Sequence, residues 1–161
     1  MLGNLGRLFT RREPAFSEAS PRDAAAIAAL HAASFHRGWS EEEIEHLLID
    51  RKNVVAHRGF IGRRLACFIL SRIVAGEAEI LSVAVASRER SRGLARRLLD
   101  LHLRRLAELG TRVVFLEVGE DNEPACRLYR RAGFREVARR EAYYQDVERR
   151  GGAALVLRCA L

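Results

Sequence analysis

Residues 90–95, Arg-Ser-Arg-Gly-Leu-Ala, constrain the fold and function of this chain more than any other segment. They follow an apolar, strand-like run at 80–85 and open an amphipathic helix expected from Gly93 to about Leu109. Glycine at the fourth position and the small Ala95 at the sixth let the backbone approach a ligand closely. The first N–H groups of the helix and the positive end of its dipole favour an anion there. The segment therefore predicts a site for a phosphate-bearing ligand.

The apolar pattern and turn signals along the chain predict a sheet with helices packed on it. The first three strands, joined by glycine turns, should form an antiparallel meander. A strand–helix–strand crossover then requires a parallel pair, and the strand after the crossover is expected to be buried on both faces. The prediction is a single mixed α/β sheet flanked by helices. The expected helices are 21–33, 41–48, 93–109 and 123–132, and the expected strands are 53–57, 65–74, 78–85, 113–116, 134–138 and 153–157.

Length and charge narrow the class of protein. With 161 residues the chain can form one domain, expected over 16–161, after a basic, loosely ordered or peripheral extension at 1–15. No apolar run is long enough to span a membrane. The net charge of +7 comes almost entirely from arginine, because Lys52 is the only lysine. The arginines are spread over several segments without interleaved aromatic residues or a known nucleic-acid-binding motif, so direct nucleic-acid binding is not expected as the main activity.

The cysteines and histidines do not predict a metal site. Cys67, Cys126 and Cys159 lie far apart in apolar surroundings, which is typical of buried free thiols in a reducing cytoplasm. No pair of cysteines has the spacing of zinc ligands, and the five histidines are scattered. His102 falls near the buried stripe of helix 93–109 and is expected to be a packed or edge histidine, the alternative being a ligand or a base.

Glu117 is the charged residue of greatest interest, because it lies near the C-terminal end of the apolar strand 113–116. Ligands of open α/β sheets bind beyond the carboxyl ends of the strands, so Glu117 and the turn at 90–95 should face one crevice. Burial there would favour the uncharged form of the carboxyl group, which suits a general base. The alternative is a strand-end glutamate paired with an arginine.

The following helix supplies two further candidates. Asn122 is expected to cap it, and Tyr129 lies about two turns inside. A tyrosine near a phosphate-binding turn can donate a proton to a leaving group. The alternative for Tyr129 is a core aromatic residue with its hydroxyl group near the surface.

Two motifs together resemble hallmarks of the GNAT superfamily of N-acetyltransferases. Arg90-x-x-Gly93-x-Ala95 is similar to the pyrophosphate-binding loop of that family. The second motif, Asn122-x-x-Ala125-x-x-Leu128-Tyr129-x-x-x-Gly133-Phe134, is similar to its helix beside the cofactor thiol. The resemblance covers about residues 16–161. It implies the GNAT fold, a mostly antiparallel sheet of six to seven strands whose central parallel pair is splayed around acetyl-CoA.

Within the superfamily the chain most resembles the bacterial ribosomal-protein alanine N-acetyltransferases. The resemblance lies in Phe35 with residues 39–42, the strand 79–85, Leu116-Glu117-Val118 with Asn122, and Tyr143-Tyr144. It departs from them at Gly119-Glu120-Asp121, where that family often has an arginine, and at Ala153-Ala154, where it often has an acidic residue. The resemblance implies that Glu117 is the base, that Tyr129 is the acid and that acetyl-CoA is the cosubstrate, without a metal. The implied cofactor-binding residues are Val83, Ala84 and Val85 for the acetyl and pantetheine groups, Ser91, Arg92, Gly93, Leu94, Ala95 and Arg96 for the pyrophosphate, and Asn122.

The implied activity is transfer of an acetyl group to the α-amine of a basic protein N-terminus, such as the alanine of ribosomal protein S18. The acids Glu41, Glu42, Glu43 and Glu45, and Glu120, Asp121 and Glu123, would attract such a terminus. They are equally what a solvated helix face with capping acids would contain. Two other readings stay open: acetylation of a small amine, such as a polyamine or an aminoglycoside, and a non-catalytic acetyl-CoA-binding module that regulates a partner.

Overall fold

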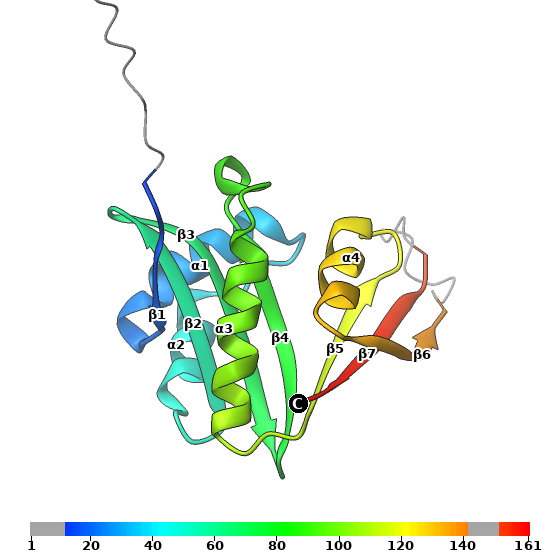
Figure 1. The fold of residues 1–161 in the computed structure, drawn as a ribbon. Coiled ribbons are helices and arrows are strands. Elements are labelled where there is room, and N and C mark those ends of the chain that lie inside the picture. Colours follow the sequence, from blue (N-terminus) through cyan, green and yellow to red (C-terminus); the bar gives the residue numbers. More distant parts are fainter. Residues whose placement is uncertain (1–11, 142–151) are drawn as a thin grey trace, which may run out of the picture.

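A computed structural model describes residues 12–141 and 152–161 of the chain (Figure 1). It contains one sheet of seven strands in the order β1-β2-β3-β4-β5-β7-β6. Only β4 and β5 run parallel, and the other neighbours are antiparallel. The predicted mixed sheet is therefore confirmed. The strands are β1 Ala15–Glu18, β2 Val54–Ile61, β3 Arg64–Val74, β4 Glu77–Val85, β5 Val113–Gly119, β6 Arg135–Arg140 and β7 Ala154–Ala160, and the helices are η1 Pro21–Asp23, α1 Ala24–Ser34, α2 Glu41–Ile49, η2 Ser87–Glu89, α3 Leu94–Glu108 and α4 Glu123–Arg131.

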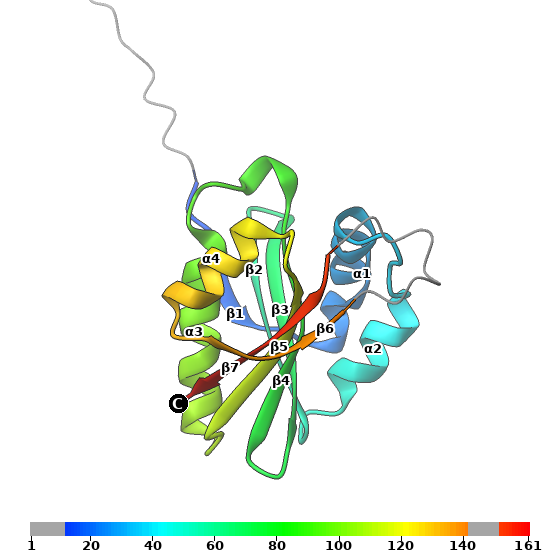
Figure 2. The same cartoon turned by 90° about the vertical axis from the view of Figure 1, so that its right-hand side faces the viewer.

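Helices cover both faces of the sheet (Figures 1 and 2). On one face α3 and α4 bury Leu98, Leu106 and Cys126 against the sheet. On the other face α1 and α2 bury Ile27 and Ile44. Helices α2 and α4 begin at a residue whose side chain caps them, and α3 begins after Gly93. In α2 the Ser40 hydroxyl accepts from the Glu43 N–H while the Glu43 carboxylate accepts from the Ser40 N–H, which forms a capping box.

Two details of the sheet differ from the prediction. Strand β1 was not predicted, because it is only four residues long and mostly exposed; it begins at Ala15, the last residue of the expected extension. Strand β5 was expected to be buried on both faces, and this is wrong. Val114, Leu116 and Val118 are buried toward α3 and α4, whereas the residues between them are partly or fully exposed. The reason is that α1 packs on β3 and β4, and α2 on β2, so their cover over β5 is incomplete.

The parallel strands β4 and β5 pair over only part of their length. Their register runs from Glu77 opposite Val113 to Ile80 opposite Leu116, and the strands then diverge (Figure 1). The pairing of β4 with β3 is irregular at the same point, because Ser71 lies opposite Ile80 and Leu70 opposite Ser82, which leaves Leu81 as an extra residue. Such a β-bulge bends its strand. The bulge at Leu81 therefore accounts for the parting of the two strands.

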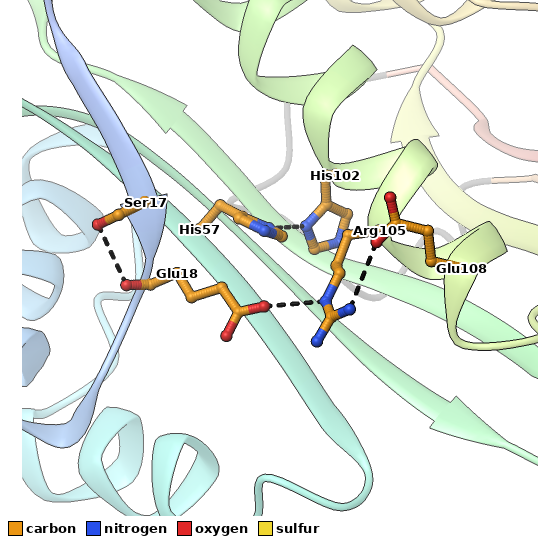
Figure 3. Close-up of polar contacts among 6 residues, drawn as sticks. All are labelled: Ser17, Glu18, His57, His102, Arg105 and Glu108. Atoms are coloured by element: carbon orange, nitrogen blue, oxygen red, sulfur yellow. Dashed lines mark hydrogen bonds and ion pairs between the residues drawn. The ribbon is translucent and has the colours of Figure 1, made fainter.

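Three buried polar side chains, each within hydrogen-bonding distance of the next, join β2, β3 and α3. The Nδ1 atoms of His57 and His102 lie 2.8 Å apart (Figure 3), and the Ser71 Oγ lies 2.7 Å from the His102 Nε2. All three residues are buried, and His102 is 0% exposed, as expected for a packed histidine. Burial lowers the pKa of His57, and it lowers the pKa of His102 to about 3. Beside these side chains, the Arg105 guanidinium on α3 pairs with Glu18 of β1 at 2.9 Å and with Glu108 at 3.4 Å (Figure 3).

Candidate active site

The predicted phosphate-binding turn lies between the end of β4 and the start of α3. Ser91 and Gly93 both have left-handed backbone conformations, with φ of 61° and 73°. For Ser91 this conformation is strained by about 1–2 kcal/mol. The first helical bond runs from the Arg97 N–H to the Gly93 carbonyl. The N–H groups of residues 91–96 donate to no other described residue, so this stretch of backbone donors is available to an anion.

The arginine side chains of this turn are engaged with the protein. The Arg92 guanidinium pairs with the Glu89 carboxylate and also donates to the Arg12 carbonyl at 3.0 Å. The Arg90 Nε donates to the Val85 carbonyl at 3.3 Å, and Arg96 pairs with Asp100 at 3.0 Å. These contacts shape the loop. The backbone N–H groups, more than the arginine charges, therefore form the candidate anion site.

The last residues of β4 border the space that opens toward β5. Val83 and Val85 pack toward the α3 side of the sheet, and Ala84 packs toward α1 and α2. Beyond Ile80 the edge of β4 that faces β5 is not paired with it. The backbone groups of 81–85 on that edge are therefore open to hydrogen bonding with a ligand.

Glu117 lies on β5 immediately after the last residue paired with β4. Its neighbours Leu116 and Val118 face α3 and α4, so its side chain projects from the opposite face. The side chain is 43% exposed and its Oε2 lies 3.6 Å from the Arg140 Nη1 of β6. The predicted burial of Glu117 is wrong, because the face of β5 on which it lies is incompletely covered. The arginine pairing considered as an alternative is present.

Tyr129 comes from α4 and lies on the other face of the sheet. It is 7% exposed and its ring meets Phe134 edge-on with the centroids 5.6 Å apart. Burial raises the pKa of Tyr129 to about 12, so its hydroxyl group keeps its proton over the physiological range. Asn122 caps this helix, since its Oδ1 accepts from the Ala125 N–H at 3.3 Å, as predicted. The cap leaves the Asn122 amide N–H groups as donors.

These residues lie around one opening in the sheet. The turn at 90–95 and the ends of β4 and β5 are at the same end of the parallel pair, with Glu117 on one face and Tyr129 on the other. The Glu117 carboxylate and the Tyr129 phenol thus come from opposite faces of the sheet. This arrangement can remove one proton and supply another during a group transfer.

The acids predicted to attract a basic acceptor divide into two groups. Glu43 is used in the cap of α2, where the hydrogen bond from the Ser40 N–H holds the pKa of its carboxyl group below the usual value. Glu120 pairs with Arg139 at 2.6 Å and Glu123 with Arg127 at 3.4 Å. Glu41, Glu42, Glu45 and Asp121 are left without an ion pair among the described residues.

A pocket of about 430 Å³ lies beside the acids of α2 and was not predicted from the sequence. Trp39, Glu42, Glu43, His46 and Leu47 line it. The Trp39 ring stacks on His31 with the centroids 4.6 Å apart, and the His31 Nδ1 accepts from the Trp39 N–H at 3.1 Å. The sequence placed Trp39 next to the α2 cap, but its spacing from His31 follows no motif. Tyr143 and Tyr144, which contributed to the predicted resemblance, lie outside the described residues.

The cysteines, possible metal ligands and possible membrane spans can be assessed over all described residues. Cys67, Cys126 and Cys159 are buried and free, as predicted. Among residues 12–141 and 152–161, no three His, Cys, Asp or Glu side chains gather in a way that could bind a metal ion. None of the helices in this part is both long and apolar enough to span a membrane.

Comparison with known proteins places this geometry in a family. The chain is 37% identical over 102 residues to the mycothiol acetyltransferase of Clavibacter sepedonicus, a match that covers 63% of this chain and 33% of that protein. It is 31% identical over 93 residues to the ribosomal protein bS18-alanine N-acetyltransferase of Escherichia coli K12, with 58% and 63% of the two chains covered. The chain thus spans less than two thirds of the length of either curated relative.

The fold has close counterparts among solved structures. The ribosomal-protein-S18-alanine N-acetyltransferase of Escherichia coli superimposes with a TM-score of 0.82 at 24% identity, over 92% of this chain and 94% of that one. The model of the acetyltransferase (GNAT) family matches residues 15–134, about three quarters of the sequence. The predicted resemblance is confirmed, and the chain belongs to the acetyltransferase (GNAT) family.

Proposed function

We propose that this protein transfers the acetyl group of acetyl-CoA to the α-amine of a protein N-terminus. The observation that carries the proposal is the opening between β4 and β5, with Glu117 and Tyr129 on opposite faces of the sheet. The expected acceptor is a basic ribosomal-protein terminus, such as the alanine of S18. The 31% identity to a bS18-alanine N-acetyltransferase supports this choice of acceptor.

The residues around the opening fit acetyl-CoA. This cosubstrate supplies the acetyl group as a thioester. The N–H groups of Ser91, Arg92, Gly93, Leu94, Ala95 and Arg96 would hold its pyrophosphate, because they donate to no described residue. The backbone of Val83, Ala84 and Val85 would bind the acetyl and pantetheine part along the free edge of β4, with the Asn122 amide as a further donor. A backbone N–H near Val83 would stabilise the negative charge that develops on the carbonyl oxygen.

Glu117 would take the proton of the acceptor amine, directly or through one water. An α-amine has an ordinary pKa of about 7.7–8.0, against about 10.4 for lysine. Roughly a tenth of it is therefore neutral at pH 7, and an exposed carboxylate is a sufficient base. The pairing with Arg140 at 3.6 Å leaves the Glu117 side chain 43% exposed, so its carboxylate remains accessible to an acceptor amine or a bridging water.

Tyr129 would protonate the departing thiolate. Its buried hydroxyl group, with a pKa raised to about 12, is protonated at the start of each cycle. Three acids of α2 that make no ion pair within residues 12–141 and 152–161, Glu41, Glu42 and Glu45, would raise the local concentration of a basic acceptor. The three buried free thiols fit the reducing cytoplasm in which we expect the protein to act.

The test is a mass-spectrometric assay of acetyl transfer to three acceptors in parallel: a peptide that begins Ala-Arg, spermidine and an aminoglycoside. The proposal expects the highest kcat/KM for the peptide, with the acetyl group on its α-amine. Mapping of acetylated protein N-termini in cells with and without this protein would then identify the acceptor. Peptide turnover no faster than turnover of the small amines would reject the protein acceptor.

A small-molecule amine is the second candidate. The 37% identity to a mycothiol acetyltransferase favours it, although the match covers only a third of that relative. In the same assay, acetylation of spermidine or the aminoglycoside at the expense of the peptide would support it. A non-catalytic acetyl-CoA-binding role predicts binding of acetyl-CoA without turnover of any of the three acceptors.

A further inference from the structure

A carboxylate from the loop after β5 occupies the space beside Gly119. Gly119 is the last residue of β5 and is still paired with Ala154 of β7. A Cβ atom built on Gly119 would lie only 2.6 Å from the Asp121 Oδ1, much closer than two such atoms can approach. The Asp121 carboxylate therefore fills the position where any other residue at 119 would begin its side chain.

The strand geometry puts this carboxylate on the same face of the sheet as Glu117. Side chains two residues apart on a strand project from one face, so the Cβ direction of Gly119 is the direction of the Glu117 side chain. Two residues of a strand span roughly 7 Å. Asp121 thus carries a second negative charge on the same face as the proposed base, about two residues further along β5 from its paired part.

Asp121 differs from its acidic neighbours because no cation among the described residues pairs with it. Glu120 and Glu123 each pair with an arginine, and Glu117 pairs with Arg140. The Asp121 carboxylate makes no ion pair or hydrogen bond with another described residue, in a chain with a net charge of +7. Helix capping does not explain it, because the Asn122 side chain already caps α4.

We infer that Asp121 is a specificity-determining residue, which binds a second cationic group of the acceptor close to the amine that is acetylated. The inference rests on the proposed function and deepens it. Acceptors of this chemistry are a peptide with arginine or lysine next to its N-terminal residue, or a polyamine with a second ammonium group. Gly119 acts with Asp121, since only glycine at 119 leaves room for the carboxylate on this face.

Two variants test the Asp121 carboxylate separately: one removes its charge, and the other moves it from its position beside Gly119. Asp121→Asn removes the charge and keeps the shape. Gly119→Ala keeps the charge and displaces the carboxylate, because the new Cβ meets only the far end of the Asp121 side chain, with the Asp121 Cγ at 3.9 Å. Glu123→Gln is the matched control, since Glu123 is a nearby carboxylate that is bound to Arg127.

The experiment measures kcat/KM for two peptides that differ only at the second residue, Ala-Arg and Ala-Gln, and for spermidine. We expect the wild type to prefer Ala-Arg, and both Asp121→Asn and Gly119→Ala to lower that preference about fivefold, as the loss of one exposed ion pair would. Turnover of Ala-Gln and the preference of Glu123→Gln should stay at the wild-type values. An equal fall in kcat/KM for spermidine would show that Asp121 recognises the charge in either class of acceptor. A fall in kcat/KM confined to the Ala-Arg peptide would identify a peptide side chain as its partner.

Three results would overturn the inference, and a fourth would fall on the proposed function. An unchanged preference in Asp121→Asn would remove the role of Asp121. A normal preference in Gly119→Ala, with thermal unfolding like the wild type, would show that the position of the carboxylate is irrelevant. Equal wild-type turnover of Ala-Arg and Ala-Gln leaves N-terminal acetylation standing and rejects only the selectivity. Failure of the wild type to acetylate any of the three acceptors would reject the proposed function, and the role of Asp121 with it.

Discussion

Acidification from pH 8 to pH 5 should destabilise the folded protein by about 2 kcal/mol through His102 alone. His102 has a pKa of about 3 in the folded chain, because it is fully buried and faces His57, against an ordinary value of about 6.5 when unfolded. A histidine with a lowered folded pKa stabilises the protein above the unfolded value, and this contribution is lost as the pH falls below about 6.5. Over the 1.5 units between about pH 6.5 and pH 5, at about 1.36 kcal/mol per unit, the loss is about 2 kcal/mol.

The geometry of the His57 and His102 rings also predicts a loss of stability on acidification. The two Nδ1 atoms face each other at 2.8 Å, so only one of them can carry a proton. A second proton would set two donors against each other inside the core. Burial lowers the pKa of His57 as well, and this adds to the loss in the same direction.

Urea unfolding of the wild type and of His102→Gln at pH 8, 6.5 and 5 would measure this contribution. The variant should be less stable at pH 8, because it loses contacts with His57 and Ser71, but its free energy of unfolding should fall about 2 kcal/mol less than that of the wild type on going to pH 5. Ser71→Ala is the matched control, since it removes one hydrogen bond and keeps the titrating ring. Parallel pH profiles for the wild type and His102→Gln would refute the reasoning.

Three further predictions concern the proposed reaction. Glu117→Gln should lower kcat at least about 100-fold without changing the Kd for acetyl-CoA in calorimetry; unchanged turnover across amines would remove Glu117 as the base. Tyr129→Phe should lower kcat by a similar factor while leaving Tm close to the wild-type value, because the ring packing against Phe134 is kept; a normal kcat would show that the hydroxyl group is not the acid. Gly93→Ala should cost about 1–2 kcal/mol of stability, because φ is 73° there, and should weaken acetyl-CoA binding by distorting the N–H donors; the space around Gly93 is open, so a normal Kd and Tm would show that the conformation is not required.

Much of this fold could be predicted because its determinants are local. The Ser40 capping box, the glycine before α3 and the period of α3 each specify an element within a few residues. The parallel pair also followed from the sequence, since a strand–helix–strand crossover permits little else. Motifs with fixed spacing then predicted that Glu117, Tyr129 and the turn at 90–95 lie near one end of the sheet.

The errors arose where the outcome depends on distant parts of the chain. The exposure of Glu117 depends on how far α1 and α2 extend over β5, which no pattern within 113–118 records. Its pairing with Arg140 depends on β6 joining the sheet through β7, at a separation of 23 positions along the chain. Strand β1 forms because β2 offers it an edge, since its own four residues carry too weak a signal to predict it.

The extra residue at Leu81 also fixes the phase of β4. Side chains of a strand alternate between two faces, so one inserted residue exchanges the faces of everything that follows. Before the bulge Ala78 and Ile80 face α3, and after it Val83 and Val85 do. Deletion of Leu81 would restore regular alternation, keep these valines on the α3 face and let β4 continue straight alongside β5. One codon therefore separates an open sheet from a closed one, so an insertion or deletion between Ile80 and Val85 in a related gene would be more informative about lost function than a substitution in the same strand.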